Sequence, residues 1–328
     1  MLALADDASP ARLVIAAAQR RARLPRRALS DRAVEGMPAR PHAWYPADQV
    51  HHHPPQLHAP TSPPSSRSSR SKKMVLKQST IEEIIESERD LVLTADQRYG
   101  DFSRHARECS IFLSRCIISV DRDRMMFARF FSLLKKHHML ALLSALRLHK
   151  VQTMINLRQV LEAGAAAAFA IANPEAEHFA AIDAQGFIDP SQELTKKRHQ
   201  WLDKNFPAGS AAIREKKDRI NDTFAHANVV STNQTFEVNE AINEISTPFF
   251  DVEDEFQVKV DLWLTASISI ELMDLLYGVN KGRDVVKFIP NFESDLHQFH
   301  QRNSALLREM QSTERYKRAF AMMQNLSE

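Results

Sequence analysis

Glycine and cysteine are scarce in this chain: its 328 residues include seven glycines and two cysteines. The glycines are scattered, so neither a GxGxxG nor a Walker phosphate loop occurs, and the GxSxG and HExxH motifs are absent as well. These absences disfavour most common enzyme classes, and we expect no bound cofactor.

The two cysteines, Cys109 and Cys116, lie seven residues apart in a predicted helix. Two helical turns separate their Cα atoms by about 10 Å, beyond the ~7 Å limit for a disulfide. We therefore expect two reduced thiols in or near the core of a cytosolic protein. The chain has no CxxC pair and no zinc-ligand spacing, which predicts no metal site.

Long apolar runs are lacking too, since a membrane-spanning helix needs ~20 such residues. The most apolar window, Met125 to Leu148, contains Arg129, Lys135 and Lys136, and the alanine-rich run Ala163 to Ala172 is too short. We expect a soluble, cytoplasmic protein that binds no membrane.

The formal net charge of +2 averages two unlike parts. Residues 1–73 hold 12 of the 43 basic residues and 5 of the 41 acidic residues, a net of +7; the remainder holds 31 and 36, a net of −5. Residues 74–328 are therefore mildly acidic and lack the clustered basic residues of a general nucleic-acid-binding surface. A local basic pocket is still compatible with this charge.

Residues 1–73 contain ten of the fifteen prolines, the cluster His51 to His53 and a Ser/Arg tract from Ser65 to Ser71. Such a segment buries too little apolar surface to fold, so we expect it to be disordered. Three interpretations compete: an organelle transit peptide, which the proline density opposes, a metal-binding histidine cluster, and an upstream extension of the reading frame. We favour the third, with Met74 as the natural start and residues 74–328 as the folded domain.

Apolar residues recur at helical spacing through most of residues 74–328. The first helix is expected to begin at Ser79, which forms a capping box with Glu82. The other predicted helices are about Asp101 to Val120, Arg124 to His149, Val151 to Ala172, Glu175 to Ala184, Ser191 to Asn205, one from Ser210, Asp254 to Val279, and a long one after Pro290. The helix from Arg124 is apolar over much of its circumference, which is typical of the centre of a bundle.

Near residues 234–252 the apolar period changes to two, which indicates a small β-hairpin or an extended excursion. Gly164 to Ala168 carry so little side chain that another backbone can approach them closely. The whole pattern predicts an all-α bundle of about six to eight helices with short connections.

The stretch Arg219 to Asn228 holds the most suggestive polar pattern. On a helix, Arg219, Asp222 and His226 share one face, so that Asp222 can orient the imidazole beneath Arg219. An imidazole beside an arginine combines a general base with a cation that stabilises developing negative charge, and His226 and Arg219 suit these roles. The structural alternative is that the same side chains pair at a helix end.

Arg158 and Glu162 form an Arg-x-x-x-Glu element that precedes an Asn-containing stretch with Asn221, His226 and Asn228. In this order the two elements resemble divergent members of the helical HEPN superfamily, over about residues 100–280. The resemblance implies an α-bundle, frequent dimers and, in active members, metal-independent RNA cleavage in toxins and host-defence systems. Active members usually carry Arg-Asn-x-x-x-His, whereas Asn221 stands here in place of the close-spaced arginine.

We therefore expect a non-catalytic HEPN-like binding and dimerisation module, a homodimer with RNA or a nucleotide as its partner. The alternative is a metal-independent ribonuclease of toxin or host-defence type that uses Arg219, Asp222 and His226. Arg158 and Glu162, together with Asn221 and Asn228, then form a binding site or a structural clasp between helices.

Two further histidine groups have structural and functional interpretations. Glu293, His297 and His300 share one predicted helix face and have the spacing of three metal ligands, but they also suit a polar helix surface. His137 and His138 point about 100° apart on a helix and cannot serve one site, so we expect them at the edge of the core.

Overall fold

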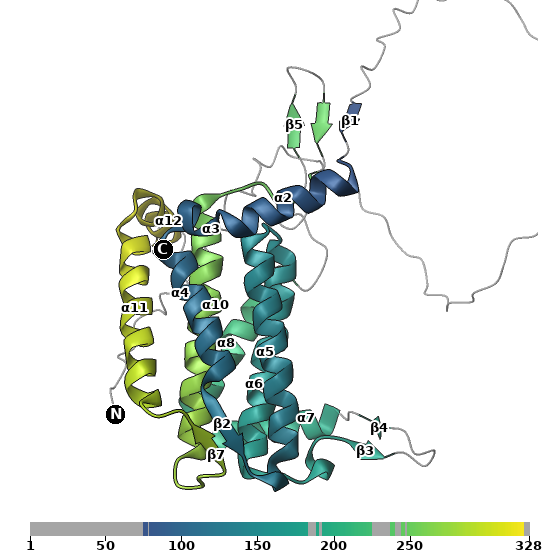
Figure 1. The fold of residues 1–328 in the computed structure, drawn as a ribbon, viewed down its shortest axis with the longest axis vertical. Helices are drawn as coiled ribbons and strands as arrows, with labels where there is room; N and C mark the ends of the chain where they lie inside the picture. Colours follow the sequence, from purple (N-terminus) through teal and green to yellow (C-terminus); the bar gives the residue numbers. More distant parts are fainter. Residues whose placement is uncertain are drawn as a thin grey trace, which may run out of the picture. The chain divides into compact units, whose positions relative to one another are not determined.

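The computed structural model describes residues 75–77, 79–182, 188–189, 192–224, 237–239, 244–246 and 248–324. Residues 1–73, for which disorder and an upstream origin were predicted, lie outside this part. Within it, long helices dominate and the strands are two to four residues long (Figure 1). The predicted all-α bundle is confirmed.

The N-terminal helix α2 (Ile81–Leu93) begins at a capping box. Thr80 Oγ1 accepts a hydrogen bond from the Glu83 backbone N–H at 3.2 Å, and the Glu83 carboxylate accepts one from the Thr80 N–H at 2.9 Å. The predicted box of Ser79 and Glu82 was wrong by one residue, because both pairs have the same spacing of three.

The centre of the bundle is α10 (Glu255–Asn280), whose N-terminus is capped by Asp254. It packs against α4, α5, α6 and α11, and nearly all of its circumference is buried. Of the described helices, α10 is the one long and apolar enough to cross a membrane by length and composition, and 78% of its apolar window is buried inside the fold. A core helix meets the same criterion, so the fold itself accounts for this apolar surface.

Two antiparallel helices, α5 (Met125–Leu146) and α6 (Lys150–Ala172), pack side by side next to α10 (Figure 1). Their connecting turn contains Leu148 at a φ of 58°. The expectation that α5 lies at the centre was wrong, because one of its faces is exposed and carries Leu133 and Leu140. Core and exposed apolar residues look alike in a sequence.

Apart from α2, the remaining helices lie on two sides of these three. α3 (Ala95–Tyr99), α4 (Asp101–Arg115), α11 (Phe292–Ser312) and α12 (Glu314–Gln324) form one side. On the other side, α7 (Gln192–Asn205) and α8 (Pro207–Phe224) pack against each other and against α6. Short 3₁₀ turns occur at Arg122–Arg124 and Ala176–His178.

Small sheets join distant parts of the chain. The predicted hairpin is present as β5 (Glu237–Asn239) and β6 (Glu244–Ser246), and β1 (Val75–Lys77) pairs in parallel with β6. The other pairs are antiparallel: β2 (Ile117–Val120) with β7 (Val286–Phe288), and β3 (Ala181–Ile182) with β4 (Ile188–Asp189).

Three predicted helices differ from the observed ones. The helix expected from Asp101 to Val120 ends at Arg115, because the residues that follow it form β2. The helix expected from Glu175 to Ala184 is a single 3₁₀ turn followed by β3. The long helix expected after Pro290 is interrupted at Thr313, which ends α11 and caps the start of α12.

The cysteines lie in the core as predicted, but only one of the two histidines lies at the expected core edge. His137 is half-buried, with its Nδ1 2.9 Å from Asn156 Oδ1, whereas His138 lies inside the core. Cys109 and Cys116 are free and buried, and burial raises the pKa of both thiols. His138 is fully buried; its Nε2 lies 3.1 Å from the Thr265 carbonyl and its Nδ1 3.3 Å from Ser110 Oγ.

Candidate functional site

Arg219 lies near the end of α8, on the helix that was predicted to carry the polar stripe. α8 begins at Pro207, three residues before the predicted start at Ser210, because proline is tolerated in the first helical turn, where its missing N–H has no partner to lose. The backbone of Asp222 continues the helix, but the side chain of Asp222 and the whole of His226 and Asn228 lie outside the described residues.

The Arg219 guanidinium pairs with the Glu215 carboxylate one turn earlier on α8, at 2.5 Å. This pair compensates the charge of Arg219 within its own helix. Asn221 stands two positions further on, which is about 200° around the helix. Its Oδ1 atom is buried and has no hydrogen-bond partner among the described residues. Arg219 and Asn221 therefore face different surroundings.

Arg158 and Glu162 form the ion pair that their spacing predicts, with Nε and Oε1 3.4 Å apart. Both side chains are 39% exposed and both lie on α6. This bond therefore joins two turns of one helix and does not by itself clasp two helices, as had been expected. Such pairs contribute about 0.3–0.5 kcal/mol to a helix.

Glu162 is also the carboxylate that faces the neighbouring helix α7. Its charge acts on both Arg198 and His199 of α7, and the charge of Lys217 on α8 acts on His199. Three packed helices thus bring Glu162 near Arg198 and His199, with Arg158 paired to Glu162 and Lys217 near His199. We name these five residues the basic cluster. Arg158, Arg198 and Lys217 outnumber the single carboxylate, so the cluster has a surplus of positive charge.

Aromatic packing fixes the Arg198 side chain. Its guanidinium carbon lies 5.5 Å from the centroid of the Phe179 ring, and its Nη2 donates a hydrogen bond to Thr195 Oγ1 at 3.0 Å. Phe179 packs in turn on Phe169, with ring centroids 5.6 Å apart. A second donor of this guanidinium, Nη1, is buried without a partner in the described part of the chain. An unpaired buried donor costs about 1–3 kcal/mol, so an acceptor on a ligand that reaches Nη1 would recover this energy.

His199 is uncharged at neutral pH. Burial lowers the pKa of its imidazole, and the positive charges of Lys217 and Arg198 lower that pKa further. The imidazole therefore offers one donor and one acceptor next to two cations. An anion bound in the basic cluster would raise this pKa again, because it stabilises the protonated form.

The histidines near the C-terminus do not form a metal site. No group of three or more His, Cys, Asp or Glu side chains that could hold a metal ion occurs within the described residues. His297 instead lies 2.9 Å from the Gln301 side chain on the same helix. The polar-surface interpretation of Glu293, His297 and His300 is the one that fits this contact.

No protein-family model, curated protein or solved structure matches this chain. Sequence reasoning found Arg158 and Glu162 but missed Arg198, His199 and Lys217. The basic run from Lys196 to His199 was the available signal, although sequence alone does not show which of its side chains turns toward Glu162.

Proposed function

We propose that this chain is a HEPN-like helical module that binds the phosphate groups of RNA, or of a free nucleotide, at the basic cluster without cleaving them. The observation that carries this proposal is the buried, unpartnered Nη1 donor of Arg198 within a surplus of positive charge. An oxyanion suits this donor, because charge-assisted hydrogen bonds from arginine to phosphate are short and strong. The Arg158–Glu162 pair and the neutral His199 supply further polar contacts at its edge.

The engagement of Arg219 supports a binding role over a catalytic one. A cation that stabilises a transition state must be available to the reacting phosphate, and the guanidinium of Arg219 is paired with Glu215. The close-spaced arginine of active HEPN members is replaced by Asn221. Binding without cleavage needs neither group.

Metal-independent RNA cleavage is the second candidate, and one observation favours it. His199 is a neutral imidazole beside Arg198, and a neutral imidazole can take the proton of a 2′-hydroxyl. The 2′-oxygen would then attack the phosphorus to form a 2′,3′-cyclic phosphate, and the 5′-oxygen would leave with a proton from water. In the expected HEPN-like arrangement, His226 and Arg219 would perform these roles instead. Cleavage assays of His199→Ala and His226→Ala distinguish these two bases.

A binding titration tests the proposal. Fluorescence anisotropy of a labelled single-stranded RNA, with ATP and inorganic phosphate as competitors, gives Kd for the wild type and for Arg198→Gln and Lys217→Gln. Each variant should weaken binding about tenfold or more, since a hydrogen bond to a charged group contributes about 1.5–3 kcal/mol. Lys196→Gln, which removes an exposed charge from the same helix, should change Kd less than twofold.

The competitors separate the two sources of phosphate. Displacement of RNA by ATP at micromolar concentration identifies a nucleotide site, whereas displacement only by longer RNA identifies a strand-binding site. Absence of binding to both ligands, or equal Kd values for the wild type and Arg198→Gln, refutes the proposal.

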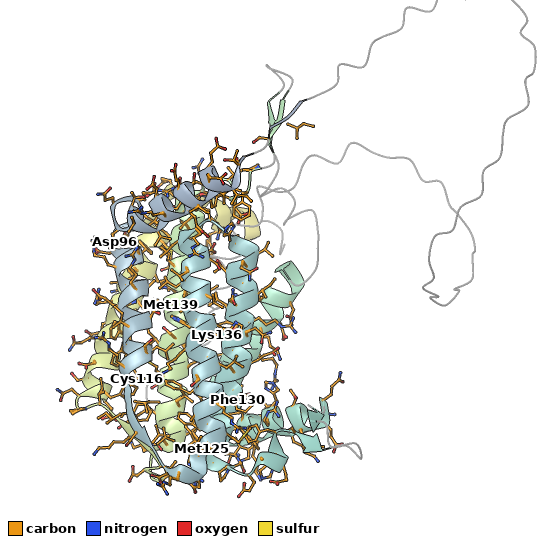
Figure 2. The ribbon with its side chains drawn as sticks, turned by 45° about the vertical axis from the view of Figure 1, so that its right-hand side comes forward. Asp96, Cys116, Met125, Phe130, Lys136 and Met139 are labelled. Atoms are coloured by element: carbon orange, nitrogen blue, oxygen red, sulfur yellow. The ribbon has the colours of Figure 1, made fainter. Side chains whose placement is uncertain are left out.

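The proposal includes a homodimer formed through the exposed face of α5. Met125, Leu133, Met139 and Leu140 are each at least 38% exposed on this helix, and Figure 2 shows Met125 and Met139 along it. Contiguous exposed apolar side chains are typical of an interaction surface. Light scattering after gel filtration should show that the wild type is a dimer. The double variant Leu133→Glu, Leu140→Glu should be monomeric, whereas the control variant Ile85→Glu on α2 should remain dimeric. A monomeric wild type at micromolar concentration contradicts this part.

A further inference from the structure

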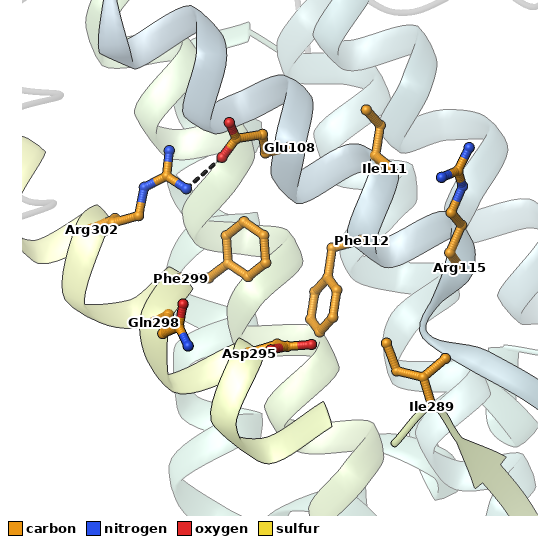
Figure 3. A pocket seen from close by; sticks show the side chains of 9 residues that line it. All are labelled: Glu108, Ile111, Phe112, Arg115, Ile289, Asp295, Gln298, Phe299 and Arg302. Atoms are coloured by element: carbon orange, nitrogen blue, oxygen red, sulfur yellow. Dashed lines mark hydrogen bonds and ion pairs between the residues drawn. The ribbon is translucent and has the colours of Figure 1, made fainter. Parts of the chain in front are cut away.

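A cavity of about 420 Å³ lies between α4 and α11, away from the basic cluster (Figure 3). Four residues of each helix line it, at positions i, i+3, i+4 and i+7, which share one helix face. On α4 these are Glu108, Ile111, Phe112 and Arg115, and on α11 they are Asp295, Gln298, Phe299 and Arg302. Each face thus carries an acid, a phenylalanine and an arginine in the same order.

The two helices are antiparallel, so the acid of one face lies toward the arginine of the other (Figure 1). At one end of the cavity this pairing is made, because Arg302 forms an ion pair with Glu108. At the other end it is not made: neither Arg115 nor Asp295 has an ion pair or a side-chain hydrogen bond with any described residue. Figure 3 shows these two side chains on either side of the Phe112 ring.

The floor between these two charges is apolar and aromatic. The rings of Phe112 and Phe299 lie 4.9 Å apart between centroids, and Phe112 also stacks on Phe292 at 5.5 Å. Ile111 is 50% exposed at the rim, so apolar surface remains open to a ligand. A volume of 420 Å³ lies in the lower part of the range of small-molecule pockets, about 300–1,000 Å³.

We propose that this cavity binds a free α-amino acid with a large apolar side chain, of which phenylalanine is the model. Arg115 has the planar fork that binds a carboxylate, and Asp295 provides the acceptor for an ammonium group. The apolar body of the ligand packs on Phe112 and Phe299 in a stacked or edge-to-face arrangement. The ligand thereby occupies the place of the second ion pair that the two helix faces do not form.

Calorimetric titration with L-phenylalanine and two of its analogues tests this proposal. Phenethylamine lacks the carboxylate and 3-phenylpropionate lacks the ammonium group, so each should bind at least tenfold more weakly than the amino acid. Arg115→Gln and Asp295→Asn should each weaken binding of L-phenylalanine about tenfold or more. Arg104→Gln, which removes an exposed arginine of α4 outside the cavity, should leave Kd within twofold.

The outcomes separate the classes of ligand. Equal affinity for 3-phenylpropionate identifies a site for apolar anions, and equal affinity for phenethylamine identifies a site for apolar amines; either result overturns the proposal. Failure of L-phenylalanine, L-tryptophan and L-leucine to bind at millimolar concentration also overturns it. The unliganded variants should melt within a few degrees of the wild type, because both substituted side chains lie at the rim, so a loss of binding reports on the site.

Discussion

The contact between α6 and α10 at Gly164 leaves no room for a methyl group. A Cβ atom built on Gly164 would lie 2.6 and 2.8 Å from the two methyl carbons of Leu272 and 3.2 Å from its Cγ. Leu272 is 1% exposed, so its side chain has no solvent to move into. We expect Gly164→Ala to push the two helices apart or to force Leu272 out of its rotamer.

The change in the free energy of unfolding on Gly164→Ala is the sum of two opposing effects. Overpacking of a filled core costs about 1–3 kcal/mol, whereas alanine gains about 1 kcal/mol over glycine in helix propensity. Gly164→Ala should therefore destabilise the fold by up to about 2 kcal/mol. Gly278 lies in α10, and a Cβ atom added to it would have nothing within 4 Å, so Gly278→Ala should stabilise the fold by about 0.5–1 kcal/mol.

Urea unfolding followed by circular dichroism measures both effects. The midpoints of the two variants should shift in opposite directions with an unchanged slope, since neither substitution changes the surface exposed on unfolding by much. In a double-mutant cycle, Leu272→Ala should remove most of the penalty at Gly164. If Gly164→Ala is as stable as Gly278→Ala, or if the cycle shows no coupling, α6 and α10 do not pack as closely as this contact requires.

Three further predictions concern buried polar groups. Burial lowers the pKa of His138 to about 4, so between pH 6.5 and 4 the imidazole is protonated in the unfolded chain but not in the folded one. Acidification across that window should therefore lower the free energy of unfolding by about 3 kcal/mol. His138→Gln should flatten the dependence of the urea midpoint on pH. Burial raises the pKa of Asp261 to about 6, and Lys150 Nζ lies 3.7 Å from its carboxylate. Lys150→Met should therefore cost about 3–5 kcal/mol at pH 8, by chemical unfolding, and less at pH 5, where Asp261 is protonated. Asn280 makes two buried hydrogen bonds with the backbone of Val286, at 2.8 and 3.0 Å, and Asn280→Ala should cost about 2–4 kcal/mol in the same assay.

The long helices were predictable because their apolar residues repeat with the helical period. α6 and α10 were placed within two residues of their observed ends. The small residues from Gly164 onward also predicted the close approach of another helix, which is α10.

Features that depend on distant partners were not predictable in the same way. Ile117 to Val120 continue the apolar pattern of α4, but they form a strand because β7, far along the chain, supplies their hydrogen bonds. The exposed face of α5 has the apolar composition of a core face, and its exposure depends on which helices pack against the others.

The same distinction holds for the candidate site. The Arg158–Glu162 pair follows from a spacing of four on one helix. The approach of Arg198, His199 and Lys217 to Glu162 depends on how α7 and α8 pack on α6, and no local spacing encodes that packing.

The most direct test of the central claim is the salt dependence of RNA binding. Three cations of the basic cluster in contact with phosphates predict a slope of about −2 in a plot of log Kobs against log salt concentration, since each neutralised phosphate of a single strand contributes about −0.7. Arg198→Gln should reduce the magnitude of this slope by about 0.7, and Lys196→Gln should leave it unchanged. A wild-type slope near zero, or an identical slope for Arg198→Gln, would contradict phosphate binding at the basic cluster.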